Sequence, residues 1–121
     1  MGLFTLEQAR TELTRLRPSL DELVVVRADV VELAAAVRLG GEPTALGGLP
    51  EWKAAEARLD ELMTVVQQTG AELKGLAPLL VDFPADLDGV PVLLCWLEGE
   101  AELAWYHRAD LGFAGRRRLP S

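Results

Sequence analysis

Apolar residues recur at alternating steps of three and four from Leu6 to Val37, and this pattern restricts the fold of the chain more than any other feature. Such spacing places the side chains in one stripe along an α-helix. Thr5 and Gln8 have the spacing of a capping box at a helix start. Gly40-Gly41 is typical of a helix end. The stripe consists of Leu6, Ala9, Leu13, Leu16, Leu20, Leu23, Val30, Ala34 and Val37.

Pro18 falls inside this stripe, where a proline removes one backbone donor and crowds the preceding turn. Residues 19–22, Ser-Leu-Asp-Glu, offer a second capping box, so one kinked helix competes with two helices that meet at the proline. The stripe keeps its phase across Pro18, which favours one helix kinked there.

A second helical stripe follows a flexible, glycine-rich loop at residues 40–50. Pro50 suits the first turn of a helix, and Thr69-Gly70 marks its end. Two helices joined by a loop predict a long antiparallel helical hairpin over residues 5–69. The second stripe consists of Trp52, Ala55, Leu59, Leu62, Val66 and Thr69.

The first helix carries more apolar surface than one stripe can bury. Large exposed apolar patches usually mark an interface. We therefore expect a homodimer built as a helical bundle, and an interaction or regulatory module as the leading function. The surplus positions are Val24, Val25, Val26, Val30 and Val31.

The pattern changes after Gly70, and residues 79–108 predict a small antiparallel sheet. Leu79–Pro84 is a short apolar run closed by proline, and residues 86–89, Asp-Leu-Asp-Gly, have turn chemistry. Two strands are expected at 90–96 and 101–107, followed by a tail at 109–121. The fold class is α+β, and the length of 121 residues fits a single domain.

Several short motifs in this region resemble a family of small prokaryotic proteins known as domain of unknown function 2203. They are Val-Asp-Phe-Pro (81–84), Asp-Gly (88–89), Leu-Cys-Trp (94–96), Gly-Glu (99–100), an aromatic pair before His107, and Gly-Phe-Ala-Gly-Arg (112–116). The resemblance covers nearly the whole chain, by pattern in the helices and by motif in residues 79–117. It supports the fold and implies no activity.

The only cysteine and the only histidine of the chain, Cys95 and His107, lie in this segment. A three-residue loop at 97–99 puts Gly99 in a left-handed conformation and places Cys95 opposite Ala101. The two side chains then share the face expected to pack on the helices, roughly 20 Å apart. A two-residue loop at 98–99 would place them on opposite faces, about 17 Å apart along the strands. Either register excludes a Cys–His dyad and makes Cys95 a buried core residue.

His107 has other candidate partners in Asp82, Asp88 and Asp110. It can cap the sheet by bonding to Asp82, hold a divalent metal with carboxylates, or act as a general base. Metal or small-ligand binding around His107 and Asp82, with enzymatic activity as one form of it, is therefore the alternative function. Glu100 and Arg116 are further ligand candidates, and Arg116 can pair with Asp82 or Glu100.

The net charge of −7 argues against nucleic acid and anionic membranes as partners, because both require clustered cations. The chain has no apolar stretch of about 18 residues, so no membrane span is expected. A single cysteine cannot form an internal disulfide. Residues 1–10 lack signal-peptide features. Together these features predict a cytoplasmic protein.

Overall fold

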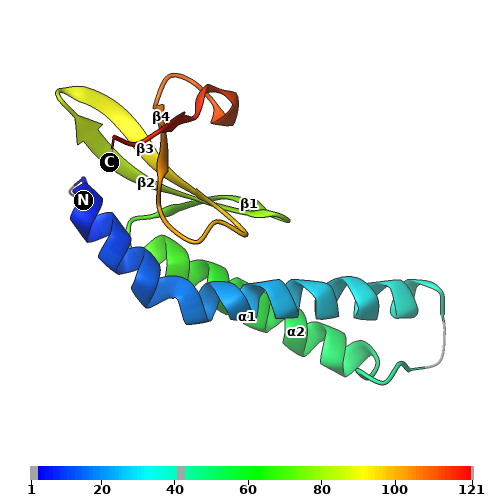
Figure 1. Cartoon of the computed structure of the whole chain (residues 1–121). Helices are drawn as coiled ribbons and strands as arrows, with labels where there is room; N and C mark the ends of the chain where they lie inside the picture. The colour runs from blue at the N-terminus through cyan, green and yellow to red at the C-terminus, as the bar shows by residue number, and fades with distance from the viewer. Residues whose placement is uncertain (1–2, 41–42, 121) are drawn as a thin grey trace. The chain divides into compact units, whose positions relative to one another are not determined.

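The computed structural model describes residues 3–40 and 43–120 and confirms the α+β class with two helices and one antiparallel sheet (Figure 1). The chain divides into two compact units. The sheet unit combines the residues before Pro18 with those from Val66 onward, and the helical unit is Pro18–Val65. Neither described helix is long and apolar enough to cross a membrane.

Helix α1 extends over Leu6–Arg38 and begins with the predicted capping box. The Thr5 backbone nitrogen donates to Gln8 Oε1 at 2.9 Å, and the Gln8 backbone nitrogen donates to Thr5 Oγ1 at 3.0 Å. Backbone N–H donors at a helix start have no acceptor within the helix, and these two bonds satisfy two of them. Pro18 lies inside α1, at the boundary between the two units. After Arg38 the chain turns at Gly40, whose φ is +63°, and the predicted partner Gly41 lies outside the described residues.

The helical unit contains the remainder of α1 and most of α2, which extends over Leu49–Gln68. The predicted start of α2 is confirmed within one residue, and Glu51 Oε1 accepts from the Gly48 backbone nitrogen at 2.7 Å. Arg58 of α2 donates two hydrogen bonds of 2.7 Å to Glu22 of α1 and lowers the pKa of that carboxyl group. The buried apolar residues of this unit are Leu20, Leu23, Val26, Leu33 and Leu62.

The sheet unit holds five antiparallel strands, each paired with its neighbour in the sequence (Figure 1). Strands β1 and β5 were not expected from the sequence, and the strand predicted at 101–107 begins only at Trp105. The bounds are β1 Glu72–Leu76, β2 Leu79–Leu87, β3 Val90–Leu97, β4 Trp105–Arg108 and β5 Arg117–Arg118, with the short 3-10 helix η1 at Phe113–Gly115.

The turn between β2 and β3 confirms the predicted turn chemistry. Asp88 and Gly89 both have positive φ, at 52° and 85°, which two-residue hairpins of the type I′ class require. The Gly89 backbone nitrogen donates to Asp86 Oδ1 at 2.7 Å, as aspartate does in tight turns. This turn sets the β2–β3 register, in which Phe83 opposes Leu94 and Asp82 opposes Cys95.

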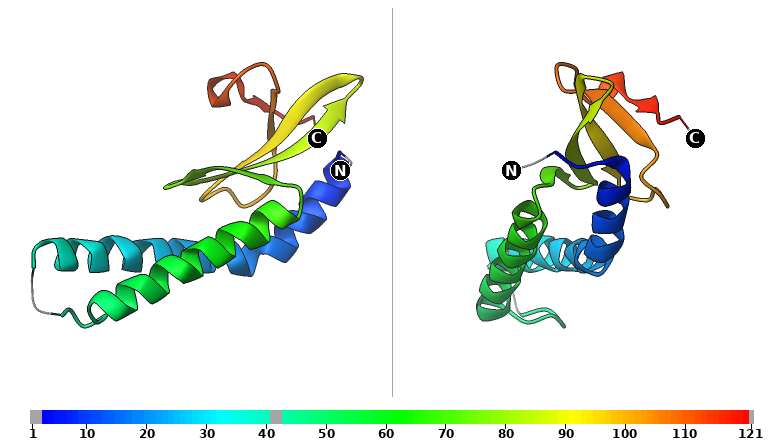
Figure 2. Two further views of the ribbon diagram at one scale, coloured as in Figure 1. Left: turned by 180° about the vertical axis from the view of Figure 1, so that it is seen from behind. Right: turned by 90° about the vertical axis from the view of Figure 1, so that its left-hand side faces the viewer.

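One face of the sheet packs on the residues at the start of the chain. The sequence predicted that this would be the face of Cys95 and His107, and that prediction is wrong. Phe4 contacts Phe83 edge to face at 5.3 Å, and Arg17 lies 5.0 Å from the Trp96 ring. Figure 2 shows the dark blue start of α1 beside the strands. Because side chains alternate along a strand, Cys95 and His107 belong to the opposite face. Residues after β4 approach that face, since Arg116 donates to the Cys95 carbonyl oxygen.

The predicted pairing of β3 with the following strand is also wrong. Cys95 pairs with Trp105 and Leu93 with His107, so residues 98–104 form a longer connection than a three-residue turn. Gly99 does have the expected positive φ, at 97°. Residues distant in sequence hold the extra loop: Arg10 donates to the Leu103 carbonyl oxygen, and Arg17 donates to the carbonyl oxygens of Glu100 and Ala101. The longer loop brings His107 toward Cys95.

Candidate functional site: a buried Asp–Cys–His cluster

Asp82, Cys95 and His107 lie together on one face of three adjacent strands, and all three are buried. One ligand atom from each, a carboxylate oxygen, Sγ and a ring nitrogen, lies within 4.8 Å of the other two. The register explains the convergence. Asp82 pairs with Cys95 and Cys95 with Trp105, and His107 is two residues further along β4, so its side chain emerges on the same face.

The imidazole of His107 is held in one orientation. Its Nδ1 lies 2.9 Å from the carbonyl oxygen of Leu111 and 3.0 Å from that of Arg108. Carbonyl oxygens can only accept, so Nδ1 carries a proton and donates it. Nε2 consequently points into the cluster, where it lies 3.3 Å from Asp82 Oδ2. A lone pair facing a carboxylate at this distance requires a proton or a cation between the two atoms.

The geometry does not fit a Cys–His–Asp relay. In such a relay one ring nitrogen faces the thiol and the other faces the carboxylate. Here backbone carbonyl oxygens occupy Nδ1, so Nε2, which faces Asp82, is the one ring nitrogen left for the cluster. The predicted separation of roughly 20 Å between Cys95 and His107 is wrong, because it assumed the short turn. The three side chains converge on one point.

Asp82 is the least satisfied group of the cluster. Its side chain is 1% exposed, and Oδ2 is shared between His107 and Lys74, whose Nζ lies 3.5 Å away. Oδ1 is buried and has no hydrogen-bond partner among the described residues. A buried carboxylate oxygen without a donor is costly, and such groups usually mark a site where a further atom binds.

Cys95 is fully buried, and its thiol is neutral near pH 7. Burial and the neighbouring Asp82 carboxylate raise its pKa to about 12, although Arg116 opposes the shift. The raised pKa excludes a free thiolate nucleophile, since reactive cysteines have lowered pKa values.

The stability of the protein is expected to fall above pH 9 because of Cys95. In the unfolded chain the thiol ionises near its ordinary pKa of 9.0, whereas in the folded chain it stays protonated up to about 12. Its contribution is therefore intact below pH 9 and lost as pH rises toward 12, by about 1 kcal/mol per pH unit. Urea denaturation at pH 8, 9 and 10 measures this slope. Cys95→Ala should fall less steeply, and equal slopes would contradict the assignment.

Arg116 holds the loop and the segment after β4 beside the cluster. It pairs with Glu100, one of the two partners predicted, with Nη2 at 2.7 and 2.9 Å from the carboxylate oxygens. Its guanidinium lies 4.8 Å from the ring centroids of both Trp105 and Phe113. These contacts fix Arg116 over the backbone of Cys95, so Arg116 and Glu100 position the site from outside it.

The other predicted acidic residues do not join the cluster. Asp88 is exposed in the β2–β3 turn. Asp110 is exposed and bonds to Arg108, with its two carboxylate oxygens 3.0 and 2.6 Å from Nε and Nη2. Sequence reasoning instead missed Cys95 and Lys74 as neighbours of Asp82. The three-residue loop already placed Cys95 on the His107 face, but it put the two residues at opposite ends of the strands, because the register was wrong.

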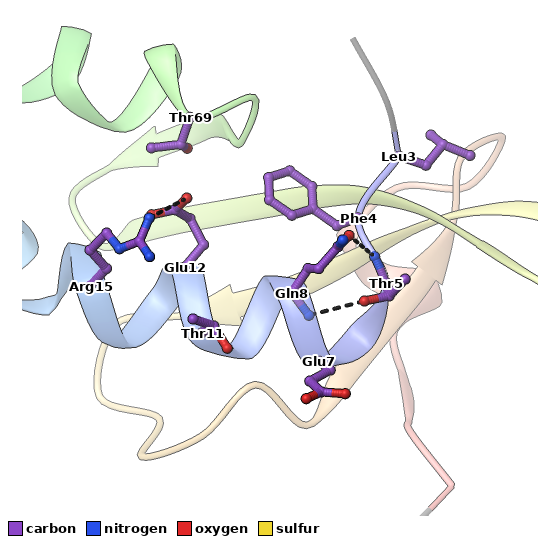
Figure 3. Close-up of a pocket in the computed structure, with 9 residues that line it drawn as sticks. All are labelled: Leu3, Phe4, Thr5, Glu7, Gln8, Thr11, Glu12, Arg15 and Thr69. Atoms are coloured by element: carbon purple, nitrogen blue, oxygen red, sulfur yellow. Dashed lines mark hydrogen bonds and ion pairs between the residues drawn. The ribbon is translucent and has the colours of Figure 1, made fainter.

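A surface hollow beside the start of α1 contains the capping box (Figure 3). Polar side chains in it bond to neighbours at the start of α1, as the dashed lines at Thr5–Gln8 and Glu12–Arg15 show. No residue of the Asp–Cys–His cluster lines it. The lining residues are Leu3, Phe4, Thr5, Glu7, Gln8, Thr11, Glu12, Arg15 and Thr69.

Comparison with known proteins identifies a family but no characterised relative. No curated protein and no solved structure gives a significant match. A family model described as an uncharacterized conserved protein, DUF2203, matches residues 2–119. This match confirms the resemblance seen in the motifs of residues 79–117, and the chain belongs to the DUF2203 family.

Proposed function

We propose that this protein binds one divalent transition-metal ion through Asp82, Cys95 and His107. The observation that carries the proposal is the convergence of a carboxylate oxygen, a thiol sulfur and an imidazole nitrogen within 4.8 Å of one another. Metal–ligand distances of 2.0–2.3 Å in tetrahedral zinc sites place ligand atoms roughly 3.5 Å apart. Small side-chain movements therefore suffice to close the cluster around an ion.

The surroundings of His107 also support a metal ligand. Histidine ligands commonly donate the second ring N–H to a backbone carbonyl oxygen, which fixes the tautomer. His107 donates Nδ1–H in this manner to Leu111 or Arg108, leaving Nε2 free to coordinate. The unpartnered Asp82 Oδ1 offers a second carboxylate atom on the same residue.

The donor set selects the class of ion. Sulfur and imidazole nitrogen favour Zn²⁺, Co²⁺ or Fe²⁺ over Mg²⁺ and Ca²⁺, which prefer shells of oxygen ligands. Three protein ligands leave a tetrahedral ion with one further position, which water or a small ligand can take.

Titration of metal-free protein, prepared without a polyhistidine tag, with Co²⁺ tests the proposal. We expect one ion per chain and a thiolate-to-cobalt absorption band, because Cys95 must lose its proton to coordinate. Cys95→Ser should abolish the band and Asp82→Asn should weaken binding, while the exposed control Asp110→Asn should bind as the wild type does. Folded wild-type protein that binds no Co²⁺ or Zn²⁺ would refute the metal site.

We also propose, as a second function, that the helices form an interaction module that pairs two copies of a cytoplasmic protein. The predicted hairpin over residues 5–69, kinked at Pro18 within a single domain, belongs to this proposal. Its support is the exposure of Val25 and Val31 on α1, at 59% and 67%. A second copy that covered these valines would remove apolar surface from water, which favours association.

Sedimentation equilibrium of the full chain tests the interaction module. We expect a dimer at micromolar concentration and a shift toward monomer in Val25→Glu/Val31→Glu. The matched control is Asp29→Glu, which keeps the charge on the same helix. A wild-type monomer at high micromolar concentration would exclude the dimer.

A further inference from the structure

Lys74 is the cation nearest to the carboxylate of the cluster. Its Nζ lies 3.5 Å from Asp82 Oδ2 and 3.1 Å from Glu72 Oε1. It sits at an irregularity of β1, since the β1–β2 register shifts between Leu73 and Gly75. The Lys74 side chain is 43% exposed, whereas Asp82 is 1% exposed. Lys74 therefore contacts the buried carboxylate while part of its own side chain is exposed to solvent.

The ammonium group of Lys74 is charged in this position. Its two ion-pair contacts are with carboxylates, those of Glu72 and Asp82, and opposite charges at these distances favour the charged ammonium form. Asp82 is the one carboxylate of the cluster, so a positive charge on Lys74 offsets the charge that a metal ion would otherwise neutralise.

We propose that Lys74 stands in for the metal ion in the metal-free protein and weakens metal binding by its charge. This inference rests on the proposed metal site. An ion bound to Asp82, Cys95 and His107 must either displace the ammonium group from Asp82 Oδ2 or tolerate it a few ångströms away. Displacement has a ready destination, because Glu72 already contacts Nζ and is about half exposed.

The physical cost of the competing charge is substantial. Two charges a few ångströms apart near a protein surface interact strongly enough to change an affinity by about tenfold or more. The same residue also stabilises the site when metal is scarce, because without Lys74 the buried Asp82 carboxylate would have only His107 and the neutral Cys95 thiol of the cluster beside it. Lys74 thus lowers the affinity of the site for metal and stabilises the metal-free site.

Three substitutions in the full-length protein separate charge from size. Lys74→Met removes the charge and keeps the length, Lys74→Arg keeps the charge, and Lys53→Met is the control on α2, in the helical unit. Each metal-free protein is titrated with Co²⁺ against a competing chelator, and folding is checked by circular dichroism. We expect Lys74→Met to bind about tenfold more tightly than the wild type, and Lys74→Arg and Lys53→Met to stay within about threefold.

The outcomes distinguish this inference from the metal site itself. Tighter binding by Lys74→Met alone supports both. Metal binding by the wild type with unchanged or weaker binding by Lys74→Met overturns the role of Lys74 and leaves the metal site intact. Equal tightening by Lys74→Arg also overturns it, since charge would not be the cause. Absence of binding by every folded variant overturns both.

Discussion

His107→Ala is expected to lower the free energy of unfolding of the metal-free protein by about 3–5 kcal/mol. The substitution removes the imidazole that faces Asp82 Oδ2 at 3.3 Å and leaves the half-exposed ammonium group of Lys74, 3.5 Å away, as the positive charge beside the buried carboxylate. It also removes the Nδ1–H donor of the Leu111 carbonyl oxygen. Urea denaturation in the presence of a chelator measures the loss, and the slope of the transition checks that the unfolded state is unchanged.

Two further variants identify the cause of that loss. Asp110→Ala removes an exposed carboxylate and should change the unfolding free energy by less than about 0.5 kcal/mol. In an Asp82→Asn background, where the buried charge is gone, His107→Ala should cost clearly less than it does alone. If the two substitutions are additive, the loss comes from packing rather than from an unpaired Asp82.

Phe83→Ala is expected to destabilise the sheet unit by about 3–5 kcal/mol. Phe83 is fully buried, and its ring meets that of Phe4 at 5.3 Å with an angle of 86° between the ring planes. Truncation removes this contact and leaves a cavity between the sheet and the start of the chain, which packed surroundings refill only in part. Chemical denaturation monitored by tryptophan fluorescence measures the effect.

Val90→Ala is the matched control, because Val90 lies in the same sheet but is 44% exposed. It should cost less than about 1 kcal/mol. A loss from Phe83→Ala no larger than that of the control would show that this face of the sheet is not the main core of the unit.

The helices could be predicted because local patterns determine them. Each step of the stripes that begin at Leu6 and Trp52 spans about one helical turn, and so does the capping box of Thr5 and Gln8. Their outcome depends on near neighbours in the chain, so α1 and α2 begin within one residue of the predicted positions. The β2–β3 turn was predictable for the same reason, since Asp88-Gly89 has the chemistry of a tight turn.

The candidate site could be predicted only in part, because long-range contacts determine it. His107 and Asp82 were found from their residue types and approximate places in the sequence. The prediction that Cys95 is buried is confirmed, but its predicted distance from His107 is wrong, because Arg10 and Arg17 of α1 bond to a loop longer than the short turn assumed. The local sequence around Gly99 does not predict the contacts that these arginines make with the loop. A loop longer by a few residues slides one strand past its neighbour and changes every pair across it.

Strand β1 was missed for a similar reason. Glu72, Lys74 and Gly75 give it no apolar alternation, and a register irregularity interrupts it. Strand β1 is stabilised by its pairing with β2, which has an apolar sequence, rather than by a strand pattern of its own. Strand β1 places Lys74 beside Asp82, although Lys74 belongs to no sequence motif.

The contacts of His107 and Arg116 have a consequence for the order of events during synthesis. Leu111, Arg116 and Leu119 follow all three residues of the Asp–Cys–His cluster in the chain. Yet Leu111 orients the imidazole, Arg116 bridges Cys95 and Glu100, and Leu119 bonds back to Ala104. On a ribosome these residues emerge after the side chains that they hold in place. The cluster is therefore complete only after Leu119 has emerged, and an ion at the proposed metal site would be loaded after that point.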